Sequence, residues 1–218
     1  MSEQYDEHEQ SERVRQWLAK NGSNLLTAFL LVIAGVGGWQ WWQGKHANQS
    51  QEAGSQYQKF TQAADKPDAA KAVILGEAVI KNYAKSDFAF LAALRLSKLQ
   101  MDQGKPDLAM AALEKAEAVA SNEQNIELAK IRKVQLLLAQ AKYVEAQKAA
   151  DAIKAVYYPA SLMEAKADIA MANGKRDQAS TLYRDVLLTL DPDSSSRAMI
   201  EMKLSDAGGT VETTQEIR

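Results

Sequence analysis

The sequence predicts an all-α protein with a single N-terminal transmembrane helix followed by a solenoid of about four divergent helix pairs. Aromatic residues make up only 7% of the 218 residues, and abundant alanine favours helices over sheet. One stretch near the N-terminus lacks charge, and alanine-centred segments recur beyond it. The predicted segments are a cytoplasmic tail over 1–23, a transmembrane helix over 24–42, a repeat domain over 43–206 and a flexible tail over 207–218.

The charge differs from one segment to the next. Residues 1–20 carry three bases and five acids, and residues 21–44 carry none. The rest of the chain holds 23 bases and 23 acids, so the repeat domain is formally neutral. Such a domain has no electrostatic footprint for phosphate, and we expect no nucleic acid partner. The absence of cysteine excludes disulfides, thiol nucleophiles and thiolate metal sites.

The stretch Leu25–Trp42 is mostly apolar. As a helix it would rise about 27 Å, close to a hydrocarbon thickness of roughly 30 Å, which predicts an anchor in the lipid bilayer. Tryptophans near both ends resemble the aromatic belts of membrane helices. They are Trp17, Trp39, Trp41 and Trp42. Two alternatives stay open: a buried core helix, and a signal peptide cleaved near the small residues 35–37.

Basic residues beside this stretch predict its orientation. Arg13, Arg15 and Lys20 precede it, whereas only Lys45 follows closely. The positive-inside rule therefore places the N-terminus in the cytoplasm. In a Gram-negative bacterium the repeat domain would lie in the periplasm, so the expected localisation is the inner membrane, with a single pass.

Short breakers separate helical runs after the predicted anchor. Gly104-Lys105-Pro106 and Asn173-Gly174 are examples, because proline and glycine end one helix and begin the next. An alanine recurs in the following helices at intervals of 37, 37 and 33 residues. These marker alanines are Ala72, Ala109, Ala146 and Ala179. The pattern resembles the tetratricopeptide repeat, a helix–turn–helix unit of about 34 residues whose second helix crosses the first at the alanine.

The first helices of the predicted units depart from this pattern. Lys133 and Lys166 stand where the pattern has an apolar residue, and only Leu96 fits it. Most of the usual aromatic markers are missing as well. A generic α-helical bundle without superhelical stacking is therefore the alternative.

First helices of such repeats line a concave surface. Applied here, this rule predicts a protein-binding groove rich in leucine, isoleucine and methionine, which suit loosely specified peptide binding. Its residues are Leu91, Leu94, Lys98, Met101, Leu128, Ile131, Gln135, Leu138, Asp168 and Met171. The alternative is that most of them simply pack against the next helix.

No catalytic pattern stands out in the sequence. The two histidines, His8 and His46, lie in the tail and at the exit of the anchor, so a Ser/His/Asp arrangement is unsupported. Metal sites with His/Cys spacing are absent. Glu164 and Asp168 lie one helical turn apart, which is typical of a solvated face. We expect no enzyme, no cofactor and no metal.

The order of the segments resembles the YfgM family, the ancillary subunit of the bacterial Sec translocon. The most specific parts are Lys20–Trp42 and Ala167–Arg184. The resemblance implies an inner-membrane protein whose periplasmic repeat domain associates with SecYEG and with PpiD, a membrane-anchored periplasmic chaperone. It further implies an adaptor or chaperone role for newly exported polypeptides, and it offers no catalytic residues.

Other functions compete with this expectation. The stack could be a structural scaffold in another envelope assembly, such as one for cytochrome maturation. Residues 1–20 could instead make the protein a stress-response regulator. An enzyme built on an acid pair is the fourth hypothesis.

Overall fold

The computed structural model describes residues 3–65 and 69–210, without the side chains of 3–14, 18, 23–26, 28 and 40–48. The chain divides into two compact units, Met1–Gln51 and Glu52–Arg218. Helix α1 (Glu3–Ala64) contributes to both units. All regular structure in the described ranges is helical, so the predicted all-α class is confirmed.

The first unit holds the N-terminal part of α1. Its large apolar side chains from Phe29 to Ile33 are more than half exposed. Over the part of the chain that is described, no helix has a segment both long and apolar enough to cross a membrane. The side chains of 24–26, 28 and 40–42 belong to the predicted span and lie outside the described residues. The transmembrane helix over 24–42 therefore stays a prediction.

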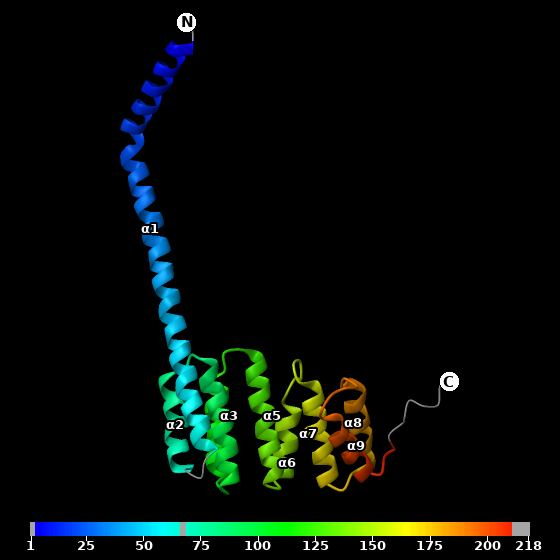
Figure 1. Ribbon diagram of the computed structural model, residues 1–218. Coiled ribbons are helices and arrows are strands. Elements are labelled where there is room, and N and C mark those ends of the chain that lie inside the picture. The colour runs from blue at the N-terminus through cyan, green and yellow to red at the C-terminus, as the bar shows by residue number, and fades with distance from the viewer. Residues whose placement is uncertain (1–2, 66–68, 211–218) are drawn as a thin grey trace, which may run out of the picture. The chain divides into compact units, whose positions relative to one another are not determined.

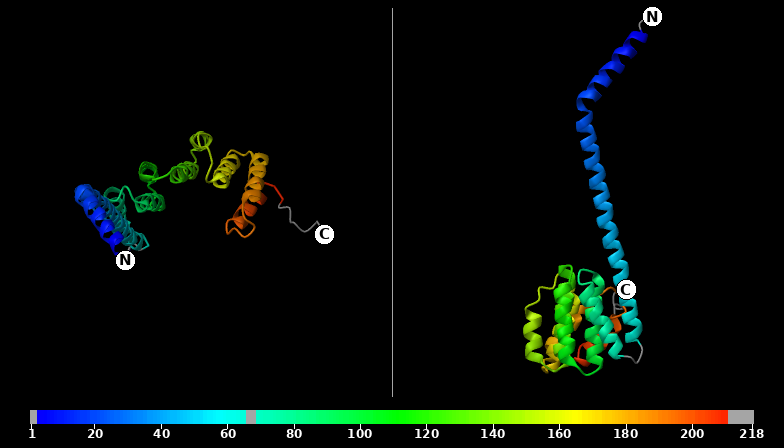
Figure 2. Two further views of the ribbon diagram at one scale, coloured as in Figure 1. Left: turned by 90° about the horizontal axis from the view of Figure 1, so that it is seen from above. Right: turned by 90° about the vertical axis from the view of Figure 1, so that its left-hand side faces the viewer.

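The second unit consists of helix pairs that follow one another along a row (Figures 1 and 2). Residues 52–64 of α1 form the first helix of the first pair. The other helices are α2 (Ala69–Asn82), α3 (Asp87–Asp102), α4 (Pro106–Val119), α5 (Glu123–Ala139), α6 (Tyr143–Asp151), α7 (Pro159–Ala172), α8 (Arg176–Thr189) and α9 (Arg197–Asp206). Helix α9 follows the fourth pair, so the prediction of about four pairs is confirmed for the described residues.

The marker alanines explain how close the two helices of a pair can approach. All four lie on second helices, α2, α4, α6 and α8, and all four are fully buried. Four residues after the first marker comes Gly76, where an added Cβ would lie 3.0 Å from the Phe60 ring. A larger side chain at these positions would force the helices apart, because protein interiors are close-packed.

Left-handed turns connect the first helix of a pair to the second. Gly104 (φ 69°), Ala141 (φ 57°) and Gly174 (φ 74°) follow α3, α5 and α7. The N–H after each turn residue donates back to the helix; that of Lys105, for example, donates to the Gln100 carbonyl at 2.9 Å. These bonds satisfy carbonyls at the helix end. Ala141 adopts this conformation without the freedom of glycine, at a cost of roughly 1–2 kcal/mol.

The apolar core is divided along the row. Four clusters occur among the described residues, and each spans helices that are consecutive in the chain, the first of them from α1 to α5. They centre on Phe60, Val79 and Leu96; on Leu113 and Leu136; on Ile131, Val134 and Ile169; and on Tyr183, Ile200 and Leu204. The fold is thus a solenoid in which each repeat packs on its neighbours.

Ion pairs explain the two lysines that depart from the repeat pattern. Lys133 of α5 lies 2.7 Å from Glu117 of α4, and Lys166 of α7 lies 3.0 Å from Asp151 of α6. Each lysine therefore joins a first helix to the second helix of the preceding pair. An ionic contact thus takes the place of the apolar contact that the pattern predicts.

The predicted segment boundaries stay predictions, and the helices give their positions in the chain. Residue 43 lies inside α1, and the second unit begins at Glu52. Helix α9 ends at Asp206, the predicted end of the repeat domain. Ala207 is buried in the last cluster, so the packed domain includes this residue. Residues 211–218 of the predicted tail lie outside the described residues.

Candidate protein-binding groove

A groove of about 670 Å³ runs between the first helices of the second and third pairs. We call it the α3–α5 groove. Its lining residues are Tyr57 of α1; Leu91, Leu94, Arg95, Ser97, Lys98, Met101 and Asp102 of α3; Leu113 of α4; and Arg132, Gln135, Leu136 and Ala139 of α5. Helix periodicity creates it, because α3 residues three and four positions apart lie on one face.

Five of the ten predicted groove residues line this groove. They are Leu91, Leu94, Lys98, Met101 and Gln135. Leu128 and Leu138 are half-buried against two different core clusters, and Met171 packs against the last one. Ile131 is only 1% exposed, which leaves it no surface for a partner. Its assignment to the groove is corrected to a core position.

Charged side chains surround the apolar floor of the groove. Arg95 forms an ion pair with Asp65, and Lys98 lies 3.0 Å from Asp102. Arg132 donates to the amide oxygen of Gln135 at 2.8 Å. Within the described ranges, Arg132 forms no ion pair with a carboxylate.

Several groove residues escaped the sequence prediction although a signal for them existed. Arg95 and Arg132 are 37 residues apart, the same interval as between the marker alanines Ala109 and Ala146. Helix α9 has the same spacing to its turn as the first helices of the pairs. Gly208 (φ 86°) follows α9, and exposed Met202 lies six residues before it, just as Lys98 and Gln135 lie six residues before their turns.

Asp168 is part of a polar network rather than of a groove. Its carboxylate accepts a hydrogen bond from the Tyr183 hydroxyl at 2.6 Å and lies 2.9 Å from Lys203 Nζ of α9. Lys203 also reaches Glu164 at 2.7 Å. The two carboxylates therefore hold α9 against α7 and do not form the solvated face expected from their spacing.

The network shifts the pKa values of its members. Burial raises the pKa of Tyr183, and the hydrogen bond to Asp168 raises it further. Burial alone would lower the pKa of Lys203, but the bonds to Glu164 and Asp168 outweigh it and raise that pKa. Both groups stay protonated at neutral pH, so the network is a permanent attachment of α9.

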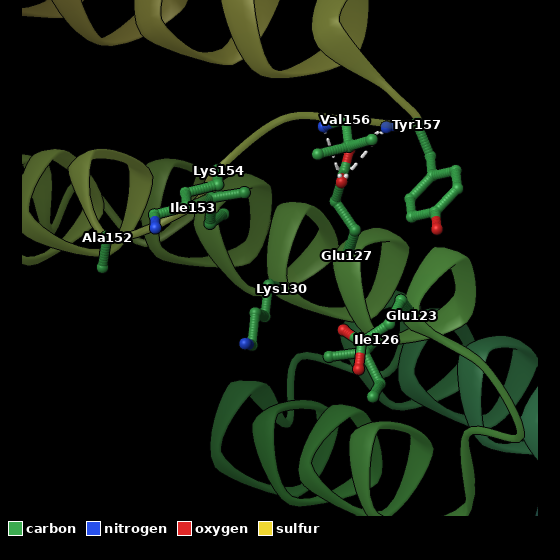
Figure 3. A pocket seen from close by; sticks show the side chains of 9 residues that line it. All are labelled: Glu123, Ile126, Glu127, Lys130, Ala152, Ile153, Lys154, Val156 and Tyr157. Carbon is green, nitrogen blue, oxygen red and sulfur yellow. Dashed lines mark hydrogen bonds between the residues drawn. The ribbon is translucent and has the colours of Figure 1, made fainter.

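A second hollow, of about 390 Å³, lies between α5 and the segment that leads into α7. Figure 3 shows its lining, with Glu127 of α5 pointing to the backbone of Val156 and Tyr157. The lining residues are Glu123, Ile126, Glu127, Lys130, Ala152, Ile153, Lys154, Val156 and Tyr157. Its wall is mixed in charge, and its exposed large apolar side chains are Val156 and Tyr157.

Glu127 fixes the segment before α7 through three backbone donors. Its buried carboxylate accepts hydrogen bonds from the N–H groups of Val156 (2.9 Å), Tyr157 (3.1 Å) and Tyr158 (2.6 Å). Burial alone would raise the pKa of Glu127, but these donors outweigh it and hold the pKa below its ordinary value. The carboxylate is thus ionised at neutral pH, and it holds the segment before α7 against α5.

The described residues contain no group of three or more metal-ligating side chains that could hold a metal ion. Asp102 of the groove, Glu127 of the second hollow, and Glu164 and Asp168 of the α9 network have the partners described above. The α3–α5 groove is therefore characterised by apolar side chains and cations, a composition suited to binding another polypeptide.

Comparison with known proteins gives matches along most of the chain. Residues 15–209 match the tetratricopeptide repeat-like domain family. An ancillary SecYEG translocon subunit of Escherichia coli (strain K12) is 26% identical over 208 residues, which cover 92% of this chain and 96% of that protein. The protein of the same name from Aggregatibacter actinomycetemcomitans is 23% identical over 181 residues, 82% of this chain and 87% of the relative.

The same name recurs for a third relative, from Haemophilus influenzae, which is 28% identical over 98 residues, 45% of this chain and 48% of that protein. Among solved structures, nearly identical TPR-like repeats of Podosopora anserina superpose with a TM-score of 0.53 at 19% identity. The match covers 70% of this chain and 83% of that one. At this identity the likeness concerns the fold alone.

Proposed function

The chain belongs to the tetratricopeptide repeat-like domain family, and from this premise we propose that it is a membrane-anchored adaptor of the Sec translocon. Its α3–α5 groove binds translocon partners and newly exported envelope proteins. The observation that carries the proposal is the near full-length similarity to ancillary SecYEG translocon subunits. The sequence resemblance to that family is confirmed by these relatives.

The groove supports the adaptor role through its chemistry. Leu91, Leu94 and Met101 present flexible apolar side chains on one helix face. Such side chains adapt to many sequences, which suits an adaptor that meets unfolded segments of different proteins. The further partner that the sequence resemblance implies is PpiD, and it would approach the same periplasmic domain.

The anchor in this proposal is the predicted transmembrane helix over 24–42. The absence of charged residues from 21 to 44 supports it, because charged side chains are costly inside a bilayer. Basic residues on the N-terminal side support a cytoplasmic N-terminus and a periplasmic repeat domain.

Washing membranes with alkaline carbonate tests the anchor. The chain is expected to stay in the membrane pellet, because the apolar helix cannot leave the bilayer when ionic contacts are stripped. Mass spectrometry of the retained protein should give the intact mass of the 218-residue chain. Release into the supernatant, or a mass that lacks residues before about 38, would refute a retained anchor and favour a cleaved leader.

Site-specific photocrosslinking tests the groove in intact membranes. A photoreactive amino acid at Leu91 or Met101 is expected to capture SecYEG subunits or exported polypeptides. The reason is that both positions line the α3–α5 groove and keep exposed surface. Crosslinked products are identified by mass spectrometry after purification in mild detergent.

Val144 provides a matched control for this experiment. It is an apolar residue on α6 outside the groove, and it is 81% exposed against 42% for Leu91. Capture that merely follows exposure would therefore be stronger at Val144. The proposed role of the groove is wrong if Val144 captures the same proteins as Leu91, or if neither groove position captures any of them.

A further inference from the structure

We propose that the α3–α5 groove selects apolar polypeptide segments that carry Asp or Glu side chains. This inference rests on the proposed function and adds the chemistry of the bound segment to it. It follows from the distribution of charge around the groove, from the exposure of the groove's own ion pairs and from the spacing of its arginines.

The groove carries an excess of positive charge, whereas the repeat domain as a whole has no net charge. Its lining includes three cations, Arg95, Lys98 and Arg132, and one carboxylate, Asp102. Asp65, the ion-pair partner of Arg95, adds a second carboxylate, so one positive charge is in excess. The chain after residue 44 is formally neutral. The excess is therefore a local property of this surface, and complementary charge on a partner gives both faster encounter and specificity.

The internal partners of these cations leave them available. Lys98 and Asp102 form an exposed pair one turn apart on α3, and Asp65, the partner of Arg95, is exposed as well. Exposed pairs of this kind contribute little to stability, so a carboxylate on a bound segment can replace them at little cost. Arg132 has the neutral amide of Gln135 as its hydrogen-bond partner.

The arginines define where a bound segment places its acids. Arg95 and Arg132 occupy the same position in successive repeats, 37 residues apart, with Leu94 and Leu136 in the floor between α3 and α5. A guanidinium binds a carboxylate through two parallel N–H donors, which gives it geometric as well as charge preference. A segment with apolar side chains between acidic ones therefore satisfies the floor and both arginines.

In α7 the repeat position equivalent to that of the two arginines is occupied by Ala165. Acidic contacts are thus confined to the middle of the row, at α3 and α5. This confinement provides the test, because removing charge at α3 and α5 should change the peptide preference, whereas removing charge on other helices should not.

The test uses the full-length protein in detergent and short fluorescent peptides with identical leucine positions. Their polar positions are all Glu, all Gln or all Lys, and binding is followed by fluorescence anisotropy. The Glu peptide is expected to bind about tenfold more tightly than the Lys peptide, with the Gln peptide between them. Added salt should weaken the Glu peptide most, because exposed charge interactions are screened.

Two variants assign the preference to the groove. The double variant K98Q/R132Q should weaken the Glu peptide several-fold and leave the Gln peptide unchanged, because both side chains are exposed and their loss leaves the fold intact. K148Q is the control, since Lys148 is an exposed lysine of α6 outside the groove. It should leave all three affinities unchanged.

Equal affinities for the Glu and Lys peptides would overturn the inference, as would a preference that K98Q/R132Q leaves in place. Displacement of the Glu peptide by inorganic phosphate at equal ionic strength would overturn it too, because the groove would then be a small-anion site. None of these three results would change the crosslinks that are expected at Leu91 and Met101. The proposed function and the acidic preference can therefore fail separately.

Discussion

Replacing Phe60 with alanine is expected to lower the free energy of unfolding of the first repeats by about 3–5 kcal/mol. The Phe60 ring is fully buried in the first core cluster and lies against Gly76, so its loss leaves a cavity between α1 and α2. Urea unfolding followed by far-UV circular dichroism measures the effect. Tryptophan fluorescence is unsuitable, because all four tryptophans precede residue 52.

Hydrogen exchange shows where the loss of Phe60 acts. Amides of α2 should lose protection, whereas those of α8 should keep it, because the two helices belong to separate clusters. Ile74→Ala is the matched control on α2, where the side chain is 68% exposed, and it should change stability by about 0.5 kcal/mol or less. Equal effects of the two substitutions would contradict the packing of the first pair.

Replacing Glu127 with alanine is expected to destabilise the third and fourth pairs by about 2–3 kcal/mol. Three N–H donors that lead into α7 lose a charged acceptor at once. The donors can recover part of the loss by binding water, because Val156 and Tyr157 are exposed. Urea unfolding and the exchange rates of these three amides measure the effect. Glu114→Ala, at an exposed position of α4, should stay within about 0.5 kcal/mol of the unsubstituted protein.

The same carboxylate predicts a dependence on pH. The pKa of Glu127 is lower in the folded chain than its ordinary value of 4.5, so folding favours the ionised form. Its contribution is complete above that ordinary value and is lost as the pH falls below it toward the folded pKa. The stability difference between the protein and Glu127→Gln, measured by urea unfolding, should therefore shrink on acidification through this range. A difference that stays constant from neutral pH to below the folded pKa would refute the claim that the ionised form of Glu127 stabilises the fold.

The repeat architecture could be predicted because its signal is periodic. Ala72, Ala109, Ala146 and Ala179 recur at regular spacing, and all of them are buried at helix crossings. The same spacing identified one wall of the α3–α5 groove, Leu91 to Met101 of α3. The rule for concave faces misplaced Ile131, because it does not say which positions of α5 the helices α6 and α7 cover.

Features that depend on pairs of distant residues escaped prediction. Glu127 and its donors are separated by about 30 residues and belong to an irregular segment, so no repeat relates them. Lys133 and Lys166 looked like flaws in the pattern, and only the structure reveals their partners, Glu117 and Asp151. Which acid meets which lysine depends on the angle between successive pairs, which spacing alone does not encode.

The division of the core into four clusters has a mechanical consequence. A load applied along the row passes through the junctions in series, so the weakest junction sets the extension of the whole domain. The junctions of Lys133 and Lys166 include ionic contacts, whose strength falls with salt, whereas each pair is closed by buried alanines. We therefore expect added salt to lower the force that is needed to extend the domain at the junctions of Lys133 and Lys166.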